Sequence, residues 1–164
     1  MRALDWIPRS TREKSKEIER TISDLINKLG RFPYEQEVAE KLGWDMEQYN
    51  KTLDMVSGTT LISLDEIITM NSSGETIRRI ETLSETFDDP LKNIERRELT
   101  DNVAKIIENL SEQERLVMAL YYYEELTLKE IGMVLKVTES RISQIHTMAI
   151  LKIRAKLKTI YHGT

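Results

Sequence analysis

The sequence predicts an all-α protein built from two small helical domains that a linker joins. Apolar residues recur at the spacing of three and four that is typical of amphipathic helices, whereas strand-like alternation is weak. Aromatic residues make up only 6% of the chain and charged residues 32%, which favours small helical units. We expect three helices in residues 1–58, a linker over 59–88, and four helices with a helix-turn-helix in residues 89–164.

The composition excludes several classes of site. The chain of 164 residues contains no cysteine, so it forms neither a disulfide nor a thiolate metal site. No apolar run approaches the length that spans a membrane, and the start lacks the charged-then-apolar pattern of a signal peptide. We therefore expect a cytoplasmic protein with no membrane partner.

The first predicted helix begins at a capping box of Ser10 and Glu13 and ends at Leu29, before Gly30. Its first turns carry cations, namely Arg9, Arg12 and Lys16. Cations are unfavourable at a helix N-terminus unless an anion lies nearby, so these side chains are candidate contacts to nucleic acid. Acidic residues are interleaved with them, and a solvated helix start remains the alternative.

Two further helices follow in the first domain. Val38 and Leu42 mark the inward side of a short helix after Pro33, Gly43 makes a turn, and Asp45 caps the next helix. The spacing matches that of the C-terminal hairpin described below, which predicts a second helix-turn-helix-like pair. Its polar face is a poor set for reading bases, so we expect a structural role.

The helical pattern fails between about Thr59 and Asp89. Residues 71–74 (NSSG) form a cluster of helix breakers, and from Leu61 to Thr100 nine acidic residues stand against five basic ones. A stretch of this length is typical of a linker or a functional loop, and a solvated acidic spacer is equally compatible with it.

The second domain begins with a helix from Asp88-Asp89-Pro90 to about Asn109. A capping box of Ser111 and Glu114 then opens a helix whose predicted inward side chains are Leu116, Val117, Leu120 and Tyr121.

The last two predicted helices form a helix-turn-helix. Thr127 and Glu130 make a capping box, Gly132 lies where the two helices approach most closely, and Thr138 caps the long helix 138–158. Its predicted buried stripe is Ile142, Ile145, Ala149, Ile153, Leu157 and Ile160.

The other face of helix 138–158 carries side chains that suit a DNA major groove. Glutamine can pair with adenine, glutamate can accept a bond from cytosine, and serine can bond either base edge. The candidate base contacts are therefore Glu139, Ser140, Ser143 and Gln144. The candidate phosphate contacts are Thr127, Thr138, Arg141, Lys152 and Arg154. From Leu126 to Thr164 seven basic residues stand against two acidic ones, whereas the whole chain has a net charge of −4.

The helix-turn-helix segment and the first domain also resemble a known protein family. The segment LTLKEIG…VTESRISQIHTMAILKIR resembles the module of bacterial sigma factors that contacts the −35 promoter element, and residues 138–145 are its most specific part. Lys136 departs from the family pattern, which usually has glycine there; a positive φ at this lysine would cost roughly 1 kcal/mol. DWIPRSTR and GRFPYEQEVAEKLGWD resemble the central sigma domain, although Tyr34 stands where the family often has a capping Thr or Ser. Together the motifs are most similar to the flagellar type of alternative sigma factor.

The resemblance implies a transcription initiation factor whose partners are promoter DNA, core RNA polymerase and an anti-sigma protein. It implies that Arg9, Arg12 and Lys16 contact DNA upstream of the start site, and that the acidic linker runs through the nucleic-acid channels of the polymerase. It also implies that a further domain, which grips the polymerase and melts the −10 region, precedes this segment.

Other functions find less support in the residues. No phosphate-binding glycine loop or nucleophile motif occurs, and His146 is more typical of a packed core than of a general base. We expect no enzyme activity, cofactor or metal. A helical adaptor that binds only protein is the competing hypothesis. The candidate protein contacts, on polymerase or inhibitor, are Tyr122, Tyr123 and Leu151, which we expect to be exposed.

Overall fold

The computed structural model describes residues 8–60, 69–70, 76–77 and 90–162. In the described part, three helices form the first group: α1 (Arg9–Leu29), α2 (Glu35–Leu42) and α3 (Met46–Thr60). Four helices form the second: α5 (Pro90–Glu108), α6 (Glu112–Tyr122), α7 (Leu128–Leu135) and α8 (Glu139–His162). The all-α prediction, with three helices before the linker and four after it, is confirmed.

The linker segment contains one piece of described regular structure. Strands β1 (Thr69–Met70) and β2 (Thr76–Ile77) pair antiparallel, with Thr69 opposite Ile77. The breaker cluster at 71–74 lies outside the described residues. Helix α3 ends and α5 begins close to the predicted bounds at residues 58 and 89, and the domain division stays a prediction.

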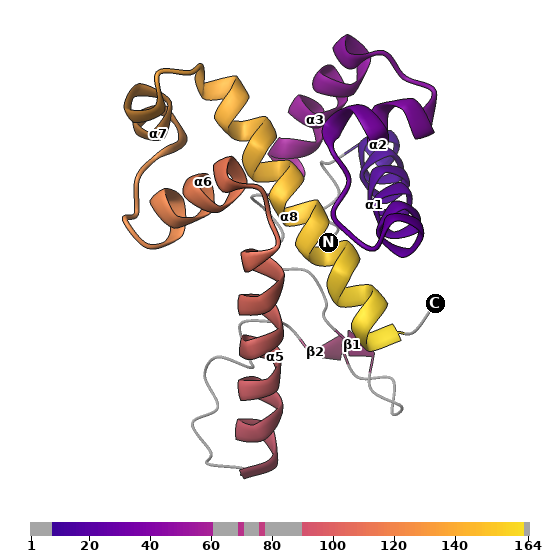
Figure 1. Ribbon diagram of the computed structural model, residues 1–164, viewed down its shortest axis with the longest axis vertical. Helices are drawn as coiled ribbons and strands as arrows, with labels where there is room; N and C mark the ends of the chain where they lie inside the picture. The colour runs from indigo at the N-terminus through magenta and orange to yellow at the C-terminus, as the bar shows by residue number, and fades with distance from the viewer. Residues whose placement is uncertain (1–7, 61–68, 71–75, 78–89, 163–164) are drawn as a thin grey trace, which may run out of the picture.

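Helix α8 is the element around which both groups pack. Figure 1 shows it running diagonally through the molecule, with α1–α3 on one side and α5–α7 on the other. It contacts α1, α3, α5, α6 and α7. Because more than one face of α8 has protein neighbours, the two helix groups pack against each other through this helix.

Local signals set most helix ends as predicted. The amide of Glu114 donates to Ser111 Oγ at 3.3 Å, and Glu114 Oε2 accepts from the Ser111 amide at 2.9 Å, which completes the capping box. Asp45 Oδ1 accepts from the Gln48 amide at 2.7 Å. Gly30 ends α1 in the left-handed conformation with φ of 71°.

The start of α1 differs from the prediction. The helix begins at Arg9, directly after Pro8, and no side chain caps it. Glu13 does not form a capping box with Ser10; its carboxylate accepts instead from Arg9 Nε at 2.9 Å. The helix starts earlier than predicted because the Pro8 carbonyl oxygen accepts from the amides of Thr11 and Arg12, at 3.0 and 3.3 Å, so the first turn closes on Pro8 and not on Ser10.

At the start of α2, where the family pattern has a capping Thr or Ser, an ion pair with Arg31 holds the Glu37 carboxylate that accepts from the N-cap amide. Glu37 accepts from the Tyr34 amide at 2.7 Å and forms a two-pronged ion pair with Arg31. Hydrogen bonding from Arg31, and then from the Tyr34 amide, lowers the pKa of Glu37 to about 2. The Arg31 guanidinium also lies 4.8 Å from the centre of the Tyr34 ring.

The largest core cluster joins the two helix groups. Its members from α1–α3 are Ile18, Ile22, Leu25, Ile26, Val38, Ala39, Tyr49 and Leu53, and α8 adds Met148, Leu151 and Ala155. A second cluster lies under the helix-turn-helix and contains Val117, Ile131, Ile142 and Ile145. The predicted stripe of α8 is confirmed in its first half, whereas Ile160 is exposed. Leu116 of α6, which was predicted to point inward, is also exposed. Among the described residues, no helix has both the length and the apolar character needed to cross a bilayer.

Candidate nucleic-acid interface

Helices α7 and α8 form the predicted helix-turn-helix. Thr127 Oγ1 accepts from the Glu130 amide at 3.3 Å, and Glu130 Oε2 accepts from the Thr127 amide at 2.8 Å. The hydrogen bond from Thr127 also lowers the pKa of the Glu130 carboxyl. Thr138 Oγ1 accepts from the Arg141 amide at 3.2 Å, so both predicted caps are confirmed.

The turn between the helices depends on two residues. Lys136 has a φ of 57°, the left-handed conformation that the family pattern gives to glycine. A Cβ atom at Gly132 would lie 2.9 Å from the carbonyl oxygen of Val137, which is closer than packed atoms approach. The absent side chain at Gly132 therefore allows α7 to meet the start of α8, as predicted.

The candidate base contacts on the first turns of α8 differ in their exposure to solvent. Glu139 and Ser140 are exposed and Ser143 is half-buried. Gln144 is only 7% exposed, which contradicts the expectation that it faces solvent. The physical reason is α3, which packs along this face of α8.

A carboxylate of α3 binds the side chains proposed to read bases. Asp54 Oδ1 accepts from Ser140 Oγ at 3.0 Å and from Gln144 Nε2 at 3.1 Å. Sequence reasoning did not find Asp54, because its bonds bridge residues 86 and 90 positions apart. A local sequence pattern does not indicate a contact between residues so far apart in the chain.

The candidate phosphate contacts also differ in their surroundings. Arg141 Nη1 donates to Glu35 Oε2 of α2 at 3.2 Å, in a half-buried ion pair. Arg154 is half-buried, and Thr127 and Thr138 are exposed with their hydroxyls engaged in the caps.

Lys152 is not the surface cation that a phosphate contact requires. Its Nζ lies 2.7 Å from Glu114 Oε1, and the two side chains are 6% and 7% exposed. The ammonium also lies 5.8 Å from the centre of the Phe32 ring. In this arrangement Lys152 ties α8 to α6, so the prediction of an accessible Lys152 is wrong.

Leu151 is likewise buried, with no exposed surface, although exposure was predicted. It belongs to the cluster shared with α1–α3, together with Met148 and Ala155. These three residues follow one another at spacings of three and four, so they form a second apolar stripe on α8. That stripe is the signal from which burial of this face could have been predicted.

The predicted protein contacts Tyr122 and Tyr123 are 58% and 84% exposed. The Tyr122 ring stacks against His146 with centroids 5.7 Å apart, and its hydroxyl lies 3.3 Å from His146 Nε2. Burial lowers the pKa of His146 and raises that of the Tyr122 hydroxyl. His146 is thus the packed core histidine that the sequence indicates.

The cations at the start of α1, Arg9, Arg12 and Lys16, are all exposed. Arg9 pairs with Glu13 of its own helix, and that contact is solvated. Their exposure is compatible with DNA contact, which stays a prediction.

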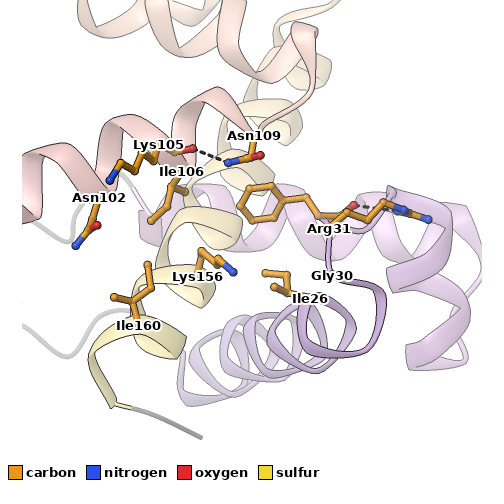
Figure 2. A pocket seen from close by; sticks show the side chains of 10 residues that line it. Ile26, Gly30, Arg31, Asn102, Lys105, Ile106, Asn109, Lys156 and Ile160 are labelled. Atoms are coloured by element: carbon orange, nitrogen blue, oxygen red, sulfur yellow. Dashed lines mark hydrogen bonds between the residues drawn. The ribbon is translucent and has the colours of Figure 1, made fainter.

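A cavity of about 270 Å³ lies where the end of α1 meets α5 and α8. Figure 2 shows Ile26 of α1 beside Lys156 of α8, with Ile106 of α5 across the cavity. Its lining combines apolar side chains with the cations Arg31, Lys105 and Lys156. Within the described ranges, no group of three His, Asp or Glu side chains is placed to hold a metal ion.

Comparisons with known proteins match both parts of the chain. Residues 13–86 match the family "Sigma-70 region 3", and residues 106–155 match "Sigma-70, region 4". The chain is 42% identical over 157 residues to RNA polymerase sigma factor FliA of Escherichia coli K12, covering 96% of this chain and 64% of that protein. It is 40% identical to FliA of Yersinia enterocolitica, over 96% of this chain and 67% of that protein. It is 38% identical to the RNA polymerase sigma-D factor of Bacillus subtilis, over 98% and 63%.

A solved structure, the flagellar sigma/anti-sigma complex Sigma-28/FlgM, aligns with 34% identity over 93% of this chain and 63% of that chain, at a TM-score of 0.49. The chain thus spans a little under two thirds of the E. coli relative.

Proposed function

Because this chain belongs to the sigma-70 family of RNA polymerase sigma factors, we propose that it directs core RNA polymerase to promoters of the flagellar class. In this role α8 reads the −35 element and the chain performs no catalysis. The observation that carries the proposal is that the region 4 match, residues 106–155, falls on a helix-turn-helix with capped helices and a glycine at the close approach. The cytoplasm, where transcription takes place, is the compartment that this role requires.

The proposed base contacts are Glu139, Ser140, Ser143 and Gln144, on the first two turns of α8. A recognition helix uses its N-terminal residues for base edges, and these positions suit that geometry. The bonds from Ser140 and Gln144 to Asp54 show that both side chains can donate to an anionic acceptor on this face. Thr127, Thr138, Arg141 and Arg154 are the proposed phosphate contacts, and Arg9, Arg12 and Lys16 the proposed upstream contacts.

Tyr122 and Tyr123 are proposed as contacts to a protein partner, because large exposed aromatic side chains are enriched in interfaces. Core polymerase is the primary partner. We also propose an anti-sigma protein as a regulator, on the basis of the resemblance to flagellar sigma factors.

The proposal is tested by a selection experiment. The chain is bound to core polymerase, and this complex selects duplexes from a pool that is randomised at the −35 element. We expect enrichment of one sequence, and Gln144→Ala should relax preference at one base position at a cost of ~1–3 kcal/mol. Gln36→Ala, which changes an exposed glutamine on α2, is the matched control. An adaptor without DNA recognition would bind polymerase and enrich no sequence.

A further inference from the structure

We propose that Lys136, in the turn between α7 and α8, is a further promoter contact that binds a DNA phosphate beside the −35 element. The inference rests on the function proposed above and adds a residue to it. Three observations support it: the backbone conformation of Lys136, the glycine at the equivalent turn between α2 and α3, and the exposed ammonium group.

The first observation is that Lys136 has a backbone conformation that is unfavourable for lysine. Its φ is 57° and its ψ is 41°, in the left-handed region. Of the other non-glycine residues that the structure describes, only Glu125 has a positive φ. Glycine adopts this region without steric cost, whereas a Cβ atom meets the neighbouring backbone there. Lysine at this position therefore costs stability, and residues held in such conformations cluster at functional sites.

The second observation is that the same chain has glycine at the equivalent turn. Gly43 lies between α2 and α3 with φ of 71° and ψ of 24°. The amides of Gly43 and of the next residue, Trp44, both donate to the Ala39 carbonyl oxygen, the second at 2.9 Å. The amides of Lys136 and of the next residue donate in the same way to the Gly132 carbonyl oxygen, the second at 3.0 Å. The two turns thus share one hydrogen-bond pattern around a left-handed residue.

Backbone energy favours glycine at both turns, so the lysine needs another explanation. A cation near the C-terminus of α7 interacts favourably with the helix dipole. However, α2 obtains this interaction from Lys41 in its last turn and keeps Gly43 in the left-handed position. The dipole therefore does not require a lysine in the turn itself. The lysine stands in the helix pair that is proposed to read DNA, and the glycine stands in the pair whose polar face is a poor set for reading bases.

The third observation is that the Lys136 ammonium group is available to an external anion. Lys136 is exposed, and within the described ranges no acidic side chain pairs with it. Two cations of α8 differ in this respect, because Arg141 pairs with Glu35 and Lys152 pairs with Glu114. Lys136 can therefore bind an anion without breaking an ion pair of the protein.

The position of Lys136 in the helix-turn-helix identifies the anion as a phosphate. The proposed base contacts Glu139 and Ser140 follow it by three and four residues. In a helix-turn-helix the first helix crosses the DNA backbone, and the N-terminal residues of the second helix reach the base edges. The turn lies between these two contacts, at the edge of the groove. A lysine ammonium on its flexible stem binds a phosphate there as a point charge.

The experiment compares two substitutions at Lys136 with a matched control, each in the chain bound to core polymerase. Lys136→Gly removes the charge and relieves the backbone conformation, whereas Lys136→Arg keeps the charge. Lys41→Gln is the control, because it removes one exposed positive charge two residues before the equivalent turn.

Two quantities are measured for each variant. The first is the affinity, by fluorescence anisotropy at several salt concentrations, for the duplex that the wild-type complex selects and for the same duplex with a scrambled −35 element. The second is the urea midpoint of the free chain, which reports the effect on stability.

We expect Lys136→Gly to weaken the binding of both duplexes by the same factor, about fivefold at about 0.15 M salt, and to flatten the salt slope by about one unit. The factor follows because one phosphate contact changes log K by about 0.9 for each tenfold change in salt, and its contribution vanishes near 1 M. Lys136→Arg should recover most of the lost affinity, and Lys41→Gln should bind as the wild type does. The urea midpoint of Lys136→Gly should equal or exceed that of the wild type.

An unchanged affinity of Lys136→Gly, with sequence selection intact, would overturn the inference and leave the proposed function standing. A contact from Lys136 to a protein partner would give this result. A loss confined to the selected duplex would also overturn the inference, because a phosphate contact does not depend on base sequence. So would an equal loss in Lys41→Gln, which would indicate a general effect of charge. If the wild-type complex selects no duplex, the proposed function fails and the inference fails with it.

Discussion

The buried ion pair of Lys152 and Glu114 gives the sharpest prediction for stability. Glu114→Ala leaves the Lys152 ammonium with 6% exposure and without its 2.7 Å partner, and it also removes the acceptor of the α6 capping box. Breaking a buried pair from one side costs ~3–5 kcal/mol, and loss of the cap adds ~1 kcal/mol. We expect the free energy of unfolding to fall by ~3–5 kcal/mol or more, a large part of the stability of a small domain.

The opposite substitution should be milder. In Lys152→Met the Glu114 carboxylate keeps its bonds from the Ser111 amide and hydroxyl, both at 2.9 Å, and methionine retains most of the apolar contact of the lysine stem. The double variant Glu114→Leu with Lys152→Met removes both charges and should be far closer to the wild type than Glu114→Ala.

Urea unfolding followed by circular dichroism measures these changes. Lys51→Met is the matched control, because it breaks a salt bridge of 2.6 Å whose side chains are 70% and 77% exposed, and it should cost less than ~0.5 kcal/mol. A loss below ~1 kcal/mol for Glu114→Ala, or a double variant as unstable as Glu114→Ala, would refute the reasoning.

Three further predictions concern single sites. Gly132→Ala should lower the free energy of unfolding by ~1–3 kcal/mol in the same urea assay, because its Cβ would lie 2.9 Å from the Val137 carbonyl oxygen; an unchanged midpoint would contradict the close packing. NMR titration should give Glu37 a pKa of about 2, and Arg31→Met should raise that pKa towards 4.5. The contribution of this ion pair to the free energy of unfolding is complete above pH 4.5 and is lost as the pH falls towards 2. Burial lowers the pKa of His146 below 6.5, so the free energy of unfolding should fall as the pH drops below 6.5, and His146→Phe should flatten this dependence, measured by thermal unfolding across pH.

The elements of the fold were predictable because their signals are local. The caps at Ser111, Thr127 and Thr138 act over three residues, and the glycine-like turn at Lys136 is set by its neighbours. Such interactions depend on the spacing of a few neighbouring residues, which can be read directly from the sequence. The helix-turn-helix was therefore correct in its position and in its close approach at Gly132.

The surroundings of the site were not predictable in the same way. Helical periodicity identified the stripe of Ile142, Ile145 and Ala149 and assigned the other face to solvent. It does not state what lies opposite that face, and Asp54 reaches Gln144 across 90 positions of sequence. Burial of Gln144, Leu151 and Lys152 depends on this long-range packing, so sequence reasoning gave each of them an exposure that the structure does not show.

The cavity between α1, α5 and α8 has a consequence for chemical control of the protein. Because its wall takes Ile26 and Arg31 from one helix group and Ile106 and Lys156 from the other, it is complete only while the groups are packed together. A small molecule with an apolar body and an anionic group would complement this lining, and it would bind the packed arrangement alone. At a concentration 100 times its dissociation constant, such a compound would favour that arrangement by about 2.7 kcal/mol. It would therefore strengthen the contact between the two helix groups while touching none of the residues proposed to read DNA.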